Sequence, residues 1–75
     1  MTLKEWLDFN QPLLNCDLLV KMLKNGSYHN QDCICELYLG LDYAKKLFGS
    51  FELKKVSVGK IDGLDHTTIK VVIWD

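Results

Sequence analysis

The spacing of apolar residues changes along the chain, from helical spacing at the start to alternation further on. Leu3, Trp6 and Leu7 recur at helical spacing and predict a short helix over residues 3–9, with these side chains on its buried face. Pro12 disfavours helix in the residue before it, so we expect the helix to end ahead of this proline.

The residues around this helix start form a complete N-terminal signal. Thr2 is placed to cap the helix with its hydroxyl, and Glu5, three residues later, is placed to accept a hydrogen bond from the Thr2 N–H. Met1 and Trp6 occupy the positions of a hydrophobic staple around this capping box. Because structure is expected from Met1 onward, we expect no signal peptide or transit segment, and a cytoplasmic protein.

Four later segments have the two-residue period of a β-strand. In the third, Leu53 falls out of phase with Val56 and Val58, so this strand either starts after Leu53 or contains a bulge. The predicted strands cover residues 17–24, 32–39, 52–59 and 67–74.

A second short helix is expected between the second and third strands. Asp42 is the expected N-cap, residues 43–48 form the body, and Gly49 is the expected C-terminal stop. Between the first two strands, an Asn-Gly pair at residues 25–26 begins a turn. The polar residues 27–32 that follow make this connection a long loop.

The predicted element order is therefore α-β-β-α-β-β. The first two strands and the last two strands are placed to pair as antiparallel hairpins. We therefore predict a single α+β domain over residues 1–75, with a four-stranded, mainly antiparallel sheet and two short helices on one face. The expected core residues are Trp6, Leu7, Val20, Met22, Cys33, Cys35, Leu37, Leu47, Phe48, Val56, Val58, Ile69, Val71 and Ile73.

The charged residues favour protein over nucleic acid as a partner. All nine basic residues are lysine, and the formal net charge is −1. Arginine is the usual residue for bidentate recognition of guanine and phosphate, so its absence argues against a sequence-specific nucleic-acid reader. Two lysine pairs are either solvated side chains or a weak site for the nucleic-acid backbone: Lys45 with Lys46, and Lys54 with Lys55. No apolar run approaches the ~20 residues that span a bilayer, so we expect no membrane insertion.

The three cysteines are an odd number, which is unusual for a disulfide-bonded secreted domain and favours a reducing compartment. Cys33 and Cys35 are expected to share one strand face, and with His29 and Cys16 they raise the alternative of a metal or thiol site. Structural zinc sites use a wider spacing in a loop, and both sulfurs continue an apolar stripe. We therefore expect buried free thiols and no metal.

No catalytic or cofactor motif is present. His29 and His66 fall in predicted loops, with no Ser or Cys nucleophile at a recognised spacing. Asp62 and Asp65 lack the alternating ligands of a calcium loop, and a turn explains them better. The glycines are isolated and make no phosphate-binding loop. We therefore expect no enzymatic activity and no cofactor.

The sheet face opposite the helices is predicted to be unusually apolar, with only Lys21, Glu36 and Lys70 among its apolar residues. An exposed apolar patch with an aromatic anchor is typical of a protein interface, and a homodimer is one such interface. Alternatively, the strand ends or Leu13 and Leu14 cover this face. The candidate partner-binding residues are Leu19, Leu23, Ile34, Tyr38, Val72 and Trp74.

The opening residues 1–7 (Met-Thr-Leu-Lys-Glu-Trp-Leu), the Leu-Tyr-Leu-Gly segment at 37–40, the Val-Ser-Val segment at 56–58 and the Ile/Val-rich closing strand together define a pattern. This pattern resembles small, mostly uncharacterised proteins encoded by phages and mobile elements of Firmicutes. Those proteins lack the cysteine pair and the long loop, so neither feature carries an inherited meaning. The resemblance implies no catalytic residue and an accessory role, which in some such proteins is to block host defences such as CRISPR nucleases.

We therefore expect a non-enzymatic accessory protein that acts by binding another protein in the cytoplasm of the host cell. The candidate partner is a host defence nuclease or its complex, and Asp62 and Asp65 would steer it toward a basic surface. The alternative is a weak nucleic-acid-binding or regulatory protein.

Overall fold

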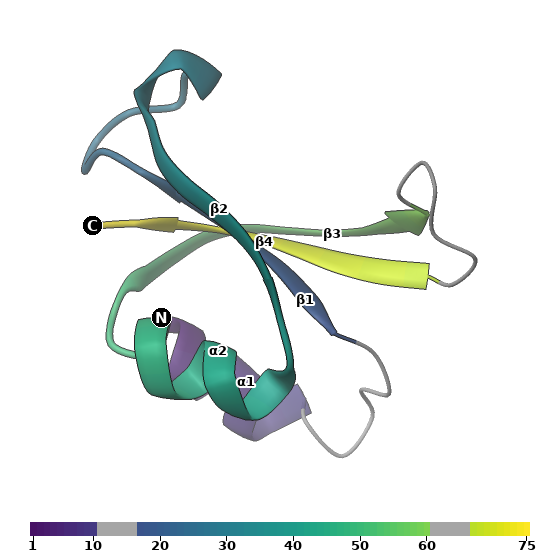
Figure 1. Cartoon of the computed structure of the whole chain (residues 1–75). Coiled ribbons are helices and arrows are strands. Elements are labelled where there is room, and N and C mark those ends of the chain that lie inside the picture. Colours follow the sequence, from purple (N-terminus) through teal and green to yellow (C-terminus); the bar gives the residue numbers. More distant parts are fainter. Residues whose placement is uncertain (11–16, 61–66) are drawn as a thin grey trace.

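The computed structural model describes residues 1–10, 17–60 and 67–75, and the chain follows the predicted α-β-β-α-β-β order (Figure 1). The α+β class is confirmed. The elements are α1 (Leu3–Asn10), β1 (Leu18–Leu23), a short 3-10 turn η2 (Asn30–Asp32), β2 (Cys33–Leu39), α2 (Leu41–Phe48), β3 (Glu52–Lys60) and β4 (Thr67–Trp74).

The four strands form one mixed sheet in the order β2-β1-β4-β3. The β1/β2 and β3/β4 pairs are antiparallel, as predicted, whereas the two central strands β1 and β4 run parallel. Both helices lie on the same side of the sheet (Figure 1). This arrangement leaves β2 and β3 as the two edges, and no α-helix of the described residues lies on the opposite face.

The core lies between the two helices and the central strands. Leu3 and Leu7 of α1 and Ala44 of α2 are buried against this side of the sheet. Burying a leucine side chain contributes roughly 1.5–3 kcal/mol, so these contacts hold the helices in place. The strand residues of the core are Leu18, Val20, Met22, Ile69, Val71 and Ile73.

Three residues expected in the core are instead exposed: Leu37 (43%), Leu47 (50%) and Val58 (67%). Their prediction as core residues was wrong because Leu37 and Val58 lie on the edge strands. The two helices are only eight residues long each and do not bury these three side chains. The two-residue period of apolar side chains cannot by itself distinguish an edge strand from a central one.

The predicted capping box at the start of α1 is confirmed. The Thr2 N–H donates to Glu5 Oε1 at 2.9 Å, and the Glu5 N–H donates to Thr2 Oγ1 at 3.2 Å. The Leu53 N–H donates to the carbonyl oxygen of Met1 at 2.9 Å, and Thr2 forms an isolated bridge with Glu52. The chain ahead of α1 is therefore joined to the first residues of β3.

The second helix begins earlier than predicted. Gly40, rather than Asp42, is the N-cap, and no side chain caps the helix. Asp42 lies in the first turn, where its negative charge favours the helix dipole. Gly49 follows the last residue as predicted, and its N–H donates to the Lys45 carbonyl at 3.0 Å. A Cβ at Gly49 would collide with that carbonyl oxygen, so glycine is needed here.

A β-bulge in β3 explains the phase change that the sequence showed. Leu53 pairs with Ile73, and Lys55 pairs with the next residue of β4, Val72, so Lys54 is the extra residue. The bulge alternative is therefore confirmed. It places both Leu53 and Val56 against the core.

A second register shift separates the two cysteines of β2. Cys35 pairs with Met22 and Cys33 pairs with Leu23, which leaves Ile34 as the extra residue. Paired residues on neighbouring strands point to the same face, so the prediction that the two cysteines share a face was wrong. Cys35 packs against the core, and both thiols are free. Cys16 lies outside the described residues.

Candidate functional site

The sheet face opposite the helices is partly covered by the loop between β1 and β2. The indole N–H of Trp74 donates to the carbonyl oxygen of Ser27 at 2.9 Å. The Tyr28 ring meets the Trp74 ring edge-on, with centroids 5.5 Å apart. The loop therefore packs over the end of β4. The sequence pattern did not predict where this loop would lie.

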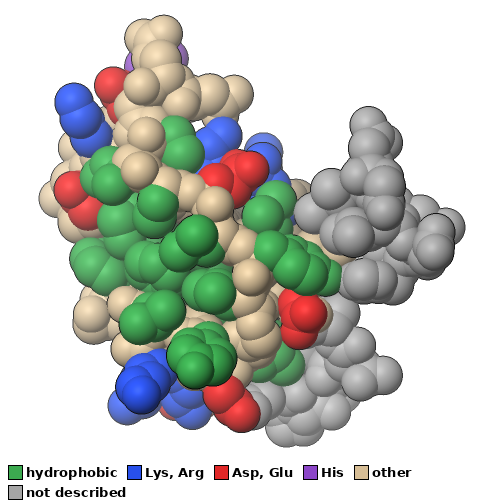
Figure 2. All heavy atoms as spheres, viewed as in Figure 1, with side chains coloured by type: hydrophobic (Ala, Val, Ile, Leu, Met, Phe, Trp, Pro, Cys, Tyr) green, Lys and Arg blue, Asp and Glu red, His purple; other side chains and the backbone are tan. Residues whose placement is uncertain are grey.

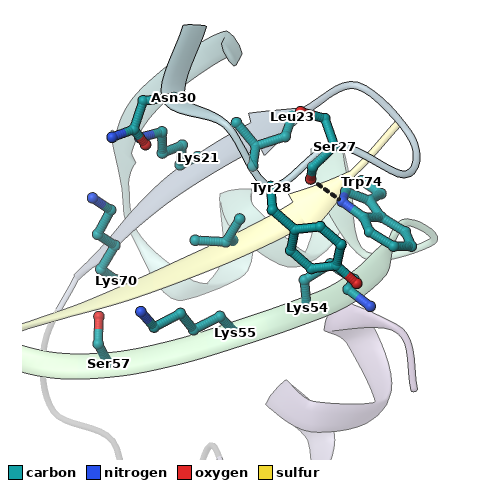
Figure 3. A pocket seen from close by; sticks show the side chains of 11 residues that line it. Lys21, Leu23, Ser27, Tyr28, Asn30, Lys54, Lys55, Ser57, Lys70 and Trp74 are labelled. Atoms are coloured by element: carbon teal, nitrogen blue, oxygen red, sulfur yellow. Dashed lines mark hydrogen bonds between the residues drawn. The ribbon is translucent and has the colours of Figure 1, made fainter. Parts of the chain in front are cut away.

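The loop and the sheet enclose a pocket of about 370 Å³ (Figure 3). Leu23 of β1 and Val72 of β4 contribute apolar lining. In Figure 3, the ammonium groups of Lys21, Lys55 and Lys70 lie at one end, and the Tyr28 and Trp74 rings lie at the other. We call these the basic end and the aromatic end.

Strand register accounts for the basic end. Val72 is flanked by its two cross-strand neighbours, Lys21 on β1 and Lys55 on β3. Lys70 is two residues earlier on β4, which places it on the same face as Val72 with Ser57 as its neighbour. The polar side chains of Ser57 and Asn30 also line the pocket, and Lys21 Nζ donates to Asn30 Oδ1. Three strands thus bring three ammonium groups to one place.

The bulge in β3 supplies a fourth lysine, at the aromatic end. Strict alternation would send Lys54 and Lys55 to opposite faces, yet both line the pocket. Lys54 Nζ lies 3.8 Å from the centroid of the Trp74 ring and 5.5 Å from that of Tyr28. Lys54 is therefore held by a cation–π interaction at the aromatic end.

A second surface lies along the outer edge of β2. Ile34, Leu37 and Tyr38 expose 48%, 43% and 39% of their surface there. On the adjoining α2, Tyr43 and Leu47 are also exposed. Figure 2 shows hydrophobic side chains gathered on the side of the molecule where β2 and α2 lie nearest the viewer. The surface combines apolar side chains with the backbone of a strand that lies at the edge of the described sheet.

The structure divides the predicted partner-binding residues between these two surfaces. Val72 and Trp74 line the pocket, and Ile34 and Tyr38 lie exposed on β2. Leu23 is 5% exposed, so its expected presentation on an open face was wrong. The loop covers it. Leu19 is half-buried, and Asp62 and Asp65 lie outside the described residues.

Sequence patterning missed the loop residues Ser27, Tyr28 and Asn30, because their contacts cross the fold and leave no periodic signal. The aromatic residue in an otherwise polar loop was the one available sign. The four lysines proposed for nucleic-acid contact do not gather on one surface. Lys45 and Lys46 lie on α2, where Lys45 is ion-paired with Asp8, whereas Lys54 and Lys55 line the pocket on the other side of the sheet.

Comparison with known proteins finds no matching family model, no similar curated protein and no similar solved structure. Among the described residues, no helix is long and apolar enough to cross a membrane. Within the same residues, no group of three or more His, Cys, Asp or Glu side chains is placed to hold a metal ion.

Proposed function

We propose that this protein acts without enzymatic chemistry, by binding another protein along the edge of β2. The observation that carries the proposal is the largely apolar character of this edge, which carries a single charged residue. An edge strand offers a row of unpaired N–H and C=O groups to any extended segment that reaches it. Flanking apolar side chains then add contact area and selectivity.

The two edges of the sheet differ in a way that supports this choice. In sequence, β3 carries Lys54, Lys55 and Lys60, and charged residues on an edge strand discourage pairing with other chains. The seven residues of β2 include a single charge, Glu36. Of the two edges, β2 is the one with fewer charged residues in its sequence.

The charge on β2 also favours a partner other than a second copy. A twofold antiparallel pairing centred on this strand would place Glu36 directly opposite its own copy, which is unfavourable. A different chain can instead place a lysine or arginine opposite Glu36. The expected partner segment is therefore extended, apolar at alternate positions and basic at its centre.

The resemblance to phage and mobile-element proteins points to a host protein, and a defence nuclease or its complex is the candidate. Relative to the sequence-based expectation, the proposed contact set keeps Ile34 and Tyr38, leaves out Trp74 and adds Leu37, which had been expected in the core. Trp74 is engaged with the loop, whereas these three side chains are exposed on one strand.

The test compares capture of partners from host lysate by the wild type and by edge variants. Ile34→Lys and Leu37→Lys each add a charge to β2, and Val58→Lys adds the same charge to the exposed surface of β3 as the matched control. We expect one partner to be lost with both β2 variants and retained with the control. In the purified complex, hydrogen exchange should slow at the β2 amides.

Two results would overturn this assignment. One is equal capture by all three variants, together with unchanged exchange in β2. The other is a dimer in light scattering that Ile34→Lys dissociates, because the edge would then belong to a second copy of this chain.

The alternative of weak nucleic-acid binding through Lys45, Lys46, Lys54 and Lys55 has less support, since these residues lie on two sides of the sheet. A salt-dependent gel shift that is abolished by Lys45→Gln/Lys46→Gln would nevertheless favour it.

A further inference from the structure

We propose that the pocket between the β1–β2 loop and the sheet binds a nucleotide, with the phosphate at the basic end and the base at the aromatic end. The pocket of about 370 Å³ falls within the range of roughly 300–1,000 Å³ that small-molecule sites occupy. The proposal concerns the face opposite the helices and does not depend on the β2 edge.

The charge of the lining is the first argument. Among the residues that the structure describes, four lysines and no carboxylate line the pocket, although the chain has more acidic than basic residues. The ion pairs among the described residues, Met1 with Glu52 and Lys45 with Asp8, both lie elsewhere. The local excess of positive charge is therefore a property of the site and not of the composition.

Lys21 is the second argument. It is only 9% exposed, and its ammonium donates to the neutral amide oxygen of Asn30 rather than to a carboxylate. Its cross-strand neighbour on β2, Glu36, is exposed, does not line the pocket and forms no ion pair among the described residues. A buried charge without a counter-charge is costly, and a bound anion would supply that counter-charge.

Register brings Lys21, Lys55 and Lys70 close enough to share one anion. Neighbouring strands lie about 4.8 Å apart, so the two lysines that flank Val72 and the lysine one pleat away surround a single spot. Three like charges on adjacent strands repel each other when the site is empty. The hydroxyl of Ser57 is placed to donate a hydrogen bond to a phosphate oxygen.

The aromatic end selects nucleotides among phosphorylated molecules. Tyr28 is 73% exposed although it lines the pocket, so its ring is accessible to a ligand. Flat bases stack on exposed aromatic rings with little dependence on sequence. Figure 3 shows the lysines and the aromatic rings at opposite ends of one pocket, which matches the two halves of a nucleotide.

Calorimetric titration of the full chain with inorganic phosphate and with AMP tests the proposal at low salt. We expect AMP to bind more tightly than phosphate. The double variant Lys55→Gln/Lys70→Gln should lower the affinity for AMP and for phosphate by about tenfold or more, because charge-assisted contacts are lost. Tyr28→Leu should lower the affinity for AMP and leave the affinity for phosphate unchanged. Lys4→Gln/Lys46→Gln removes the same charge from the two helices and should change neither affinity more than about twofold.

Urea unfolding of each variant shows whether it is folded before titration. The proposal fails if AMP produces no heat up to about 10 mM, if both double variants lose affinity equally, or if AMP binds no better than phosphate. A short single-stranded oligonucleotide identifies the source of the nucleotide. Tighter binding of the oligonucleotide than of AMP, lost in Lys55→Gln/Lys70→Gln, assigns the site to a strand end, and tighter binding of AMP assigns it to a free nucleotide.

Discussion

Trp74 and Ser27 are joined by a hydrogen bond of 2.9 Å from the indole N–H to the backbone carbonyl oxygen, across 47 residues of sequence. This bond holds the loop between β1 and β2 over the end of β4. It explains why the face without helices is a pocket rather than an open apolar surface. It also removes Trp74 from the side chains free to anchor a partner.

Trp74→Phe keeps an aromatic ring but removes the donor, so we expect a loss of about 0.5–1.5 kcal/mol in the free energy of unfolding. Amides of the loop between β1 and β2 should exchange faster in the variant. Urea unfolding and hydrogen exchange measure the two effects. Trp6→Phe on α1 is the control, and similar loop exchange in both variants would contradict the role of this bond.

Lys54 and Lys55 are neighbours with opposite expected effects on stability. Lys54→Met removes the cation–π contact with Trp74 and should cost about 0.5–1 kcal/mol. Lys55→Met removes one of three mutually repelling charges and should leave stability unchanged or slightly higher at low salt. Urea midpoints at two salt concentrations compare them, and equal losses would contradict the assigned roles.

Glu5 makes the stability depend on pH. Hydrogen bonds from the Thr2 N–H and then from the Thr2 hydroxyl hold the pKa of Glu5 below its ordinary value of 4.5. Because the folded protein binds this proton less readily than the unfolded chain does, the contribution is present above pH 4.5 and is lost as the pH falls through the lowered pKa.

Glu5→Gln keeps an acceptor in the capping box but removes the titration. We expect the wild type to be more stable than the variant near neutral pH, and the difference to shrink in acid. Urea midpoints of both proteins between neutral and acidic pH measure this. A constant difference would show that Glu5 does not titrate within the folded capping box.

The exposed fractions of two leucines predict different costs of truncation. Leu7 is 1% exposed, so Leu7→Ala should lower the free energy of unfolding by about 2–5 kcal/mol through lost burial and a cavity. Leu47 is half exposed, and Leu47→Ala should cost less than about 1 kcal/mol. Chemical denaturation distinguishes them, and similar costs would place Leu47 in the core after all.

Two glycines outside the helices provide a matched pair. A Cβ at Gly49 would collide with the Lys45 carbonyl oxygen, whereas one at Gly59 would meet open space. Gly49→Ala should therefore be strongly destabilising by thermal unfolding, and Gly59→Ala close to neutral. A neutral Gly49→Ala would mean that α2 can end without this close approach.

Features that depend on near neighbours were predictable from the sequence. The capping box of Thr2 and Glu5 and the stop at Gly49 each involve residues within a few positions of each other, and the phase change after Leu53 indicated either a bulge or a later strand start. Helical spacing and strand alternation likewise located all six main elements and the face of α1. Local backbone geometry and side-chain period are encoded in short segments, so the sequence by itself determined them.

Features that depend on strand order were decided only by the tertiary structure. The parallel pairing of β1 with β4 makes β2 an edge, exposes Leu37 and brings Lys21 next to the β4 residue that Lys55 flanks from the other side. The bond from Trp74 to Ser27 then folds a polar loop over these lysines. Such contacts join segments tens of residues apart, and no short-range pattern records which strands will meet.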